Sequence, residues 1–222
     1  MLAGVNGTQA MKPIRIPLFP LNVVLFPGST LPLHIFEHRY RIMIRRCLSE
    51  GIEFGIILAT DKGVATVGCT AAITQRLKEH SDGRCEILTE GRSIFRVVEL
   101  LEEKEYREAI VEYLPEDITP GSKAELERKE GALLGVFQEC HALLYDQPWV
   151  TASKENREAI SYRMAARLPL TLEERQTILE FRAEPQRQDF LIQWMTDLVP
   201  RLTQQQRIRH SMSSNGRDHG MN

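Results

Sequence analysis

The stretch from Ile14 to Tyr40, IRIPLFPLNVVLFPGSTLPLHIFEHRY, limits most strongly what this chain can fold into. It contains four prolines, Pro17, Pro20, Pro27 and Pro32. Because proline fixes φ and lacks an N–H, no helix can pass through this stretch. It predicts two short extended segments, Ile14–Leu18 and Thr30–Phe36, joined by an apolar loop that turns at Pro27-Gly28. Pro32 indicates that the second segment is an edge strand or contains a bulge.

The hydrophobic period changes after Glu37. Apolar residues then recur at helical spacing, at Tyr40, Met43, Ile44, Cys47 and Leu48. The arginines of this segment, Arg39, Arg41, Arg45 and Arg46, fall mostly off the apolar stripe. The pattern predicts an amphipathic helix that follows the second extended segment directly.

Further short strands are predicted up to residue 115. The β-rich segments are 54–59, 64–77, 84–99 and 106–114, with Gly68 a candidate bulge. Asp82-Gly83 is typical of a hairpin turn with positive φ at both central positions. Short strands at this spacing, with one helix inserted early, favour a small, partly open β-barrel.

The composition shifts after Pro115, and helical patterns follow. Capping signals and apolar stripes predict four helices, and Thr171 with Glu174 three residues later is a capping-box pattern. We therefore expect a β-barrel subdomain over residues 12–115 and a helical bundle over residues 122–200. Residues 1–11 and 201–222 are expected to be flexible termini.

Several segments of this chain resemble one protein family. PLFPLNVVLFPG followed by LPLHIFEHRYRIM resembles the opening of the Lon protease N-terminal domain, the substrate-binding module of an ATP-dependent protease. The resemblance continues in order along the chain and spans about residues 12–199 in total. The matching segments are FGIIL, GCTAAI, DGRCEILTEGRSIFRV, YREAIVEYL, MAARLPLTLEERQTILE and QRQDFLIQWM. The chain departs from the family's Gly-Thr at Gly68-Cys69-Thr70. The resemblance implies an α+β fold, a PUA-like pseudo-β-barrel with an inserted helix, followed by an all-helical bundle.

The catalytic motifs of a complete Lon protease are missing from the sequence. No Gly-x-x-x-x-Gly-Lys-Ser/Thr loop is present, and no Gly-Lys pair occurs at all. Ser153 and Lys154 are neighbours, and adjacent residues on a helix do not face each other, so Ser153 is better explained as a helix cap than as a nucleophile. We expect a stand-alone Lon-domain protein that is not an enzyme and has no catalytic residues.

We expect no cofactor and no metal site either. His34, Glu37 and His38 invite a metal interpretation. A change from strand to helix falls between the two histidines, however, and the H-E-x-x-H order is absent. One strand histidine and one near a helix start is the simpler interpretation.

The arginine-bearing helix has two interpretations. Arg41, Arg45 and Arg46 are candidate anionic contacts, because PUA-like barrels include RNA binders, or they form a solvated face. Residues 12–115 carry 14 Lys and Arg against 14 Asp and Glu, and residues 116–200 carry 10 against 15. RNA-binding domains usually show a basic surplus, so nucleic acid is the less favoured partner.

Two apolar features are candidate polypeptide contacts. Leu25 and Phe26 in the apolar loop belong either to the core or to an exposed patch that binds other chains. Trp149, after Pro148, either packs inside the molecule or contacts a partner. The sequence predicts a non-enzymatic module that recognises unfolded polypeptide or a protein partner in protein quality control. The alternative is an RNA-binding protein, and hydrolase activity is disfavoured by the missing motifs.

Composition points to a cytoplasmic location. No run of about 18 apolar residues is present, so no membrane span or membrane partner is expected. The first residues lack the charged start and apolar core of a secretory signal. The four cysteines are widely spaced without a C-x-x-C motif, which is typical of reduced thiols.

Overall fold

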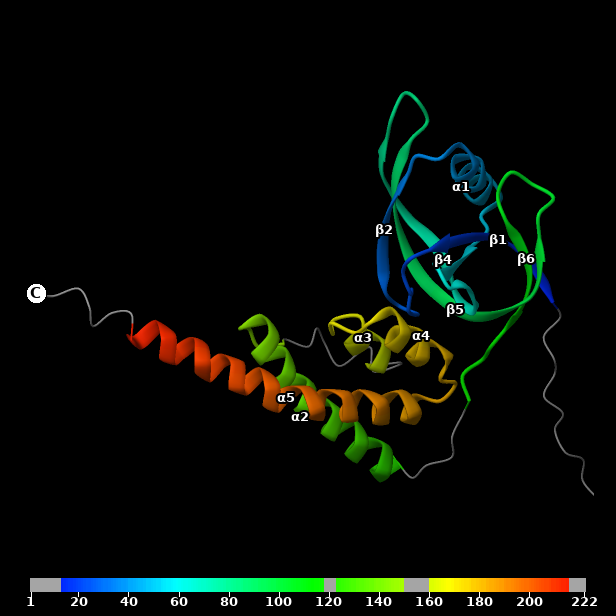
Figure 1. The fold of residues 1–222 in the computed structure, drawn as a ribbon. Helices are drawn as coiled ribbons and strands as arrows, with labels where there is room; N and C mark the ends of the chain where they lie inside the picture. Colours follow the sequence, from blue (N-terminus) through cyan, green and yellow to red (C-terminus); the bar gives the residue numbers. More distant parts are fainter. Residues whose placement is uncertain (1–12, 118–122, 150–159, 216–222) are drawn as a thin grey trace, which may run out of the picture. The chain divides into compact units, whose positions relative to one another are not determined.

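The structure, a computed structural model, describes residues 13–117, 123–149 and 160–215. The chain forms two compact units. The first comprises the residues up to Pro115 together with Thr171–Glu180, and the second comprises Glu116–Leu170 and the residues from Phe181 onward. Figure 1 shows the six strands and five helices of the described residues.

The first unit is a β-barrel. Its strands are β1 Ile14–Leu21, β2 Thr30–Ile35, β3 Phe54–Thr60, β4 Gly63–Glu79, β5 Cys85–Leu101 and β6 Glu108–Tyr113. The sheet order is β2-β5-β4-β3-β1-β6, and β5 pairs with β6 as well. Only β1 and β3 run parallel among the described pairs. The additional pairing closes a ring of five strands and leaves β2 as an edge strand, as Pro32 predicted.

The barrel is closed rather than partly open, because β5 is long enough to pair with β4 along one side and with both β2 and β6 along the other. Its 17 residues pair with β2 over Cys85–Glu90 and with β6 over Phe95–Leu101. Along most of its length β5 also pairs with β4. The alternating pattern predicted the strand, but alternation alone does not reveal how many neighbours a strand has.

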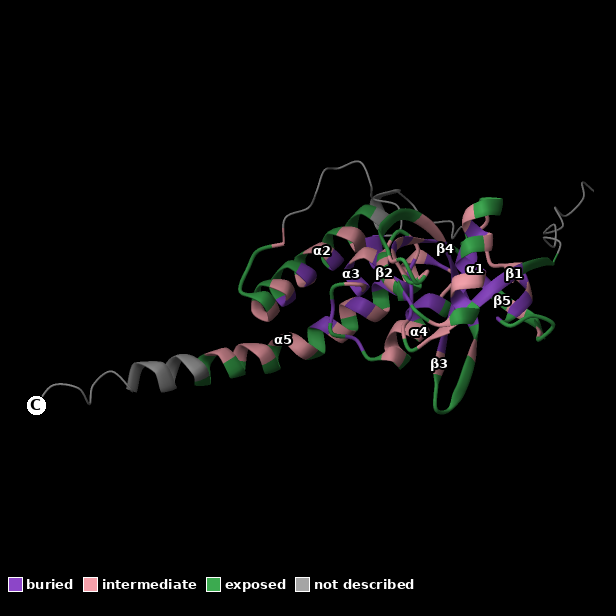
Figure 2. Ribbon diagram, turned by 90° about the horizontal axis from the view of Figure 1, so that it is seen from above, coloured by how far each residue is buried: buried purple, intermediate pink, exposed green. Residues whose placement is uncertain are grey.

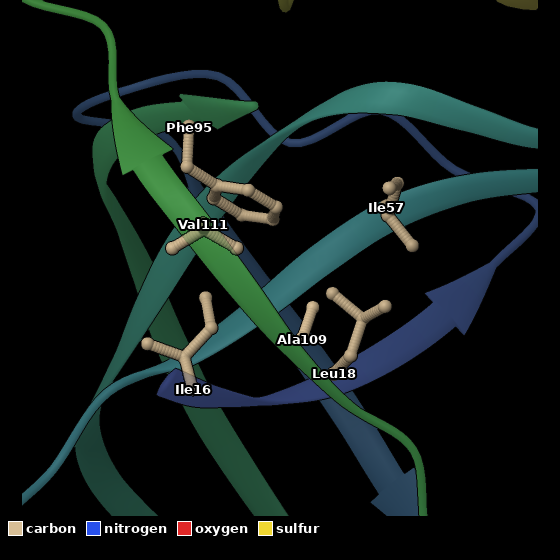
Figure 3. Close-up of a cluster of buried hydrophobic side chains, with 6 residues drawn as sticks. All are labelled: Ile16, Leu18, Ile57, Phe95, Ala109 and Val111. Atoms are coloured by element: carbon tan, nitrogen blue, oxygen red, sulfur yellow. The ribbon is translucent and has the colours of Figure 1, made fainter. Parts of the chain in front are cut away.

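Apolar side chains from four strands, β1, β3, β5 and β6, form a buried cluster inside the barrel. Figure 3 shows Ile16, Leu18, Ile57, Phe95, Ala109 and Val111, which are all buried. Two glycines make room for the Phe95 ring: a Cβ on Gly55 or Gly68 would lie 2.7 or 2.6 Å from its Cζ atom. Gly68 therefore permits close packing. The register of β4 shifts against β5 between Cys69 and Ala71, and against β3 between the pairs Ile57–Gly68 and Ala59–Val64.

The loop between β1 and β2 folds back onto β5. The side chains of Leu25 and Phe26 are 4% and 1% exposed. The Gly28 N–H donates to the Gly91 carbonyl at 2.9 Å, and the Gly91 N–H donates to the Ser29 carbonyl at 2.9 Å. A Cβ on Gly91 would lie 2.2 Å from the Phe26 carbonyl oxygen. Gly91 therefore lets the apolar loop approach the strand.

The hairpin between β4 and β5 turns over His80–Arg84. The Gly83 N–H donates to the His80 carbonyl at 2.9 Å, and the His80 N–H donates to the Arg84 carbonyl at 2.9 Å. Gly83 has a φ of 83°, whereas Asp82 is not among the residues with positive φ. The hairpin is confirmed, but only one central residue adopts the left-handed conformation. The Asp82 carboxylate instead accepts hydrogen bonds from the backbone and side chain of Arg84.

Helix α4, Leu172–Glu180, belongs to the barrel unit. The predicted capping box is confirmed: the Thr171 N–H donates to Glu174 Oε2 at 2.7 Å, and the Glu174 N–H donates to Thr171 Oγ1 at 3.2 Å. Gln176 Nε2 donates to the Val67 carbonyl on β4. The expected helical bundle, residues 122–200, included this segment, whereas the structure assigns it to the barrel unit. The sequence of a helix does not by itself indicate which unit the helix packs against.

The second unit is helical. It contains α2 Lys123–Tyr145, α3 Ile160–Ala165 and α5 Glu184–Asn215, and both α2 and α3 pack against α5. Buried positions occur in α2, α3 and the first part of α5, while exposed and intermediate ones dominate further along α5 (Figure 2). On the apolar stripe predicted for α2, Leu133, Phe137 and Cys140 are buried. Ser153, expected as a helix cap, lies outside the described residues, as do residues 1–11, expected as a flexible terminus.

Helix α5 is longer than the sequence predicted. A flexible terminus was expected from residue 201, but α5 continues through Pro200 to Asn215. A single proline removes one hydrogen bond, and the following residues 201–208 contain three Gln and two Arg, which favour helix.

Candidate functional site

Helix α1, His38–Glu50, forms one wall of the candidate site. Tyr40, Met43, Ile44 and Cys47 are its buried residues, which confirms the predicted stripe. The helix ends at Gly51, whose φ of 65° is the left-handed conformation that favours glycine. The stripe holds α1 on the barrel unit and leaves Arg41 and Arg45 at its margin.

Arg46 anchors this wall to the barrel. Its Nη1 donates to Glu108 Oε1 at 2.6 Å and to the Tyr106 hydroxyl at 3.1 Å, and its Nε donates to both Glu50 oxygens. The Glu108 side chain is 2% exposed and also accepts hydrogen bonds from Arg15 and Lys104. Burial raises the pKa of this carboxyl, but the hydrogen bonds from Arg15, Lys104 and Arg46 outweigh it and lower the pKa below its ordinary value.

The outer part of the β4–β5 hairpin forms the opposite wall. Arg41 joins the two walls, because its Nη1 donates to the Asp82 carbonyl in the turn. A Cβ on Gly83 would lie 3.3 Å from the same Nη1 atom. The guanidinium of Arg41 therefore spans the gap where the turn is closest to α1.

A pocket of about 220 Å³ lies between these walls, inside the barrel unit. It is lined by Arg41, Ile44, Arg45, Leu48, Ser49, Arg76, Glu79, Gly83, Cys85 and Ile87. Three of these residues are aliphatic and three carry guanidinium groups. The arrangement suits a ligand that has both an apolar part and a negative charge.

The arginines of α1 and the pocket differ in how many hydrogen bonds and ion pairs they already make within the protein. Arg46 lies outside the lining, and Arg41 is bonded to the turn. In the described part of the chain, Arg45 is exposed and makes no hydrogen bond or ion pair. Arg76 Nη1 lies 3.9 Å from Glu79 Oε2, and both groups are largely exposed. An exposed pair at that distance is weak, so Arg76 retains capacity for a second anion.

Cys85 is the one thiol in the pocket lining. Cys47, Cys69 and Cys140 are buried, and all four cysteines are free. Burial raises the pKa of Cys85, and the nearby Glu79 carboxylate adds to the effect. Burial also raises the pKa of Cys47 and Cys69 to about 12. These shifts make the thiols poor nucleophiles near neutral pH.

Of the two interpretations of Leu25 and Phe26, the structure supports the core one. Both residues are buried, and the loop that carries them is hydrogen-bonded to β5 at Gly91. Neither therefore offers an exposed contact for another chain. Their apolar character comes from their place in the core, and composition alone does not separate that role from an exposed patch.

Trp149 lies in the second unit. Its ring meets Phe137 edge to face, with centroids 5.0 Å apart, and Phe137 in turn contacts His141. The indole is only partly buried.

The second unit also contains a buried arginine that the sequence reasoning missed. Arg187 is 1% exposed, and its guanidinium lies 4.3 Å from the Tyr162 ring centroid. It donates to Ser161 Oγ at 2.9 Å and to Glu184 Oε2, and it is ion-paired with Glu116. A signal existed, because Arg187 precedes Leu191 and Trp194 by four and seven residues and so shares their helical stripe.

No group of three metal-ligating side chains occurs in the part of the chain that the structure describes. His34 stacks on Phe36, with ring centroids 5.8 Å apart, and His38 lies 3.7 Å from Glu105. Within the same described residues, no helix is long and apolar enough to cross a membrane. That the chain carries no catalytic site remains a prediction.

The fold and the pocket define an α+β binding module, in which a closed barrel is accompanied by a helical unit. The chain belongs to the family of the ATP-dependent protease La (LON) substrate-binding domain, whose model matches residues 15–197. This confirms the resemblance seen in the sequence.

Known relatives agree with the family assignment. Lon protease 2 of Myxococcus xanthus is 30% identical over 183 residues, which cover 76% of this chain and 22% of that protein. Lon protease of Escherichia coli is 26% identical over 89% of this chain and 26% of its own length. The chain thus spans about a quarter of the length of the curated relatives it matches.

Solved structures share the fold. A Lon N-terminal domain protein from Xanthomonas campestris has a TM-score of 0.64 and 29% identity, covering 82% of this chain and 99% of that one. The N-terminal domain of Mycobacterium avium complex Lon protease has a TM-score of 0.62 at 17% identity, covering 83% and 99%. At that lower identity the likeness shows the fold alone.

Proposed function

We propose that this chain is a non-enzymatic module that binds segments of protein substrates, among them unfolded polypeptide, in protein quality control. The pocket between α1 and the β4–β5 hairpin carries this proposal, together with membership of a substrate-binding family. Ile44, Leu48 and Ile87 give the pocket an aliphatic lining. Unfolded chains expose the apolar side chains that such a lining removes from water.

The size of the pocket favours part of a chain over a whole small molecule. Sites for drug-sized ligands usually measure about 300–1,000 Å³. A pocket of about 220 Å³ is smaller and suits one or two side chains of a longer ligand. The rest of a bound polypeptide would then lie on the surface around the opening.

We keep Trp149 as a second proposed contact. Tryptophan is enriched where one chain binds another, and Trp149, which packs on Phe137, is only partly buried. Leu25 and Phe26 are not part of this proposal, because they are buried.

Nucleic acid is the weaker alternative. Arg46, one of the three proposed anionic contacts, is already bonded to Glu108 and Glu50. Glu79 lines the pocket beside Arg45 and Arg76 and would repel a run of phosphates. RNA binding through several phosphates would fall steeply with salt, whereas binding by apolar burial would fall little.

The test is fluorescence anisotropy of a labelled, permanently unfolded polypeptide titrated with this protein at low and high salt. We expect binding that largely survives high salt and weakens about tenfold in Leu48→Ser, because a half-buried leucine contributes about 1.5 kcal/mol or more when covered. Val98→Ser is the matched control, since Val98 is 56% exposed and lies outside the pocket lining.

Two results would contradict the proposal. The first is the absence of any binding to unfolded polypeptide while circular dichroism shows a folded protein. The second is equal weakening by Leu48→Ser and Val98→Ser, which would place the contact elsewhere. Binding of a labelled single-stranded RNA that disappears at high salt, without polypeptide binding, would favour the nucleic-acid alternative.

A further inference from the structure

We propose that the pocket is selective for the C-terminal residue of a polypeptide whose last side chain is apolar. This inference rests on the proposed function and specifies its substrate class. The apolar side chain would lie on Ile44, Leu48 and Ile87, and the terminal carboxylate would pair with the guanidinium groups of Arg45 and Arg76.

The charges of the lining carry the first step. The lining contains three arginines, Arg41, Arg45 and Arg76, and one acidic residue, Glu79. It therefore has a formal surplus of two positive charges. The barrel segment 12–115 as a whole is neutral, with 14 basic and 14 acidic residues. The surplus is therefore a local property of the pocket, and a carboxylate complements it.

Two arginines remain able to bind an anion. Arg41 is held by the Asp82 carbonyl, which leaves Arg45 and Arg76. Arg45 is exposed and makes no hydrogen bond or ion pair among the described residues, and Arg76 has only the 3.9 Å contact with Glu79. A planar guanidinium matches a carboxylate in a two-point geometry.

Glu79 limits the charge of the ligand. A phosphate carries about two negative charges at neutral pH and would meet the Glu79 carboxylate in the same pocket. A single carboxylate needs less compensation. The lining therefore favours one carboxylate over a phosphate group.

The combination of charge and apolar surface points to a chain end. A C-terminal residue such as leucine carries its carboxylate and its apolar side chain on the same Cα. An internal acidic residue offers the charge without the apolar group, and its apolar neighbour in an extended chain points to the opposite side. A small pocket of about 220 Å³ also accommodates a terminus more easily than a chain that must enter and leave.

The experiment uses anisotropy to compare the binding of four short labelled peptides, which differ only in their last two residues and terminal group, to the full chain. The first ends in Leu with a free carboxylate, and the second is its C-terminal amide. The third ends in Ser with a free carboxylate, and the fourth is an amide with Glu before the final Leu. We expect the first to bind about tenfold or more tightly than each of the others, as for a lost hydrogen-bonded charge or a lost apolar contact.

Variants identify the carboxylate's partners. In the double variant Arg45→Gln with Arg76→Gln, we expect the ratio between free acid and amide to fall to about one. The control is Arg201→Gln with Arg207→Gln, which removes the same charge from exposed positions on α5 and should keep the wild-type ratio. Thermal unfolding of each variant checks that the fold is intact.

The outcomes separate this inference from the function on which it rests. Equal binding of acid and amide, with unfolded polypeptide still bound, overturns the terminal specificity alone. Equal binding of the first and fourth peptides overturns it too, because an internal carboxylate then suffices. If neither the peptides nor unfolded polypeptide bind, the proposed function fails as well.

Discussion

Arg46 and Glu108 lie 62 residues apart in sequence and are joined by a hydrogen bond of 2.6 Å between Nη1 and Oε1. The bond ties α1, one wall of the pocket, to strand β6 of the barrel. The Glu108 side chain is 2% exposed, and that of Arg46 is 31% exposed. Removing the Glu108 carboxylate would thus destabilise the barrel and also weaken the attachment of α1 to it.

We expect Glu108→Gln to lower the free energy of unfolding by about 1–3 kcal/mol at neutral pH, because a charged, hydrogen-bonded acceptor is lost. The folded-state pKa of Glu108 is lowered relative to its unfolded value of about 4.3. Ionised Glu108 therefore stabilises the fold above that value, and this stabilisation is lost as pH falls through the folded-state pKa.

Urea denaturation followed by circular dichroism over a pH series measures this effect. The difference between wild type and Glu108→Gln should shrink as pH falls below about 4.3. Glu99→Gln is the control, since Glu99 is exposed on β5 and has no partner among the described residues. A difference that stays constant down to strong acid would show that the charge of Glu108 is not what stabilises the fold.

Gly91→Ala should destabilise the barrel unit by about 1–3 kcal/mol, as overpacking does. The new Cβ would lie 2.2 Å from the Phe26 carbonyl oxygen, which is backbone and cannot move alone. Gly131→Ala in α2 is the matched control. Its Cβ meets nothing within 4 Å, and alanine favours helix, so it should be stabilising by about 0.5–1 kcal/mol. Thermal unfolding of both variants gives the comparison, and equal shifts would rule out close packing as the reason for Gly91.

Arg187→Met should destabilise the helical unit by about 2–4 kcal/mol, because Glu184 and Ser161 lose their shared donor. Both tryptophans, Trp149 and Trp194, belong to this unit, so their fluorescence reports its unfolding separately. Denaturation followed by tryptophan emission should shift to lower urea in Arg187→Met and remain unchanged in Arg201→Met, an exposed control on the same helix. A variant as stable as wild type would show that the buried guanidinium is replaceable by apolar packing.

Most strands and helices were predictable because their signals are local. The alternation of Ala109 and Val111 with outward residues, the Thr171 capping box and the prolines before Tyr40 each act within a few residues. The closure of the barrel was not predictable, since it depends on β5 pairing with strands on both sides. The end of α5 was misjudged because residues 201–222 are polar and terminal, which is typical of a flexible tail, whereas the helix continues to Asn215.

The candidate site was only half predictable. Arg41 and Arg45, which line the pocket, were predicted as candidate anionic contacts from their place on α1. Arg76 and Cys85, across the pocket, come from a hairpin later in the chain, and no spacing rule links that hairpin to α1. Leu25 and Phe26 show the opposite case, because an apolar loop looks the same in sequence whether it covers a core or binds a partner.

Binding at Trp149 can be followed directly in Trp194→Phe, which leaves Trp149 as the single tryptophan. If Trp149 contacts substrate, its emission should shift to the blue as unfolded polypeptide is added, because a partly buried tryptophan then loses its remaining contact with water. Trp149→Phe in turn leaves Trp194 alone and serves as the control. An unchanged spectrum at saturating polypeptide would remove Trp149 from the binding surface.

Cys85 offers a chemical measure of pocket occupancy. It lines the pocket and is only partly buried, whereas Cys47, Cys69 and Cys140 are buried. We expect a thiol-alkylating reagent to modify Cys85 first, and increasingly fast as pH rises, because the raised pKa keeps the thiolate scarce near neutral pH.

Saturation with the peptide that ends in Leu and a free carboxylate should slow this reaction several-fold, while its amide at the same concentration should not. Mass spectrometry of the alkylated sites, with Cys85→Ser as control, distinguishes the cysteines. Equal protection by acid and amide would leave the pocket as a binding site but remove its preference for a chain end, and no protection by either would place the bound peptide elsewhere.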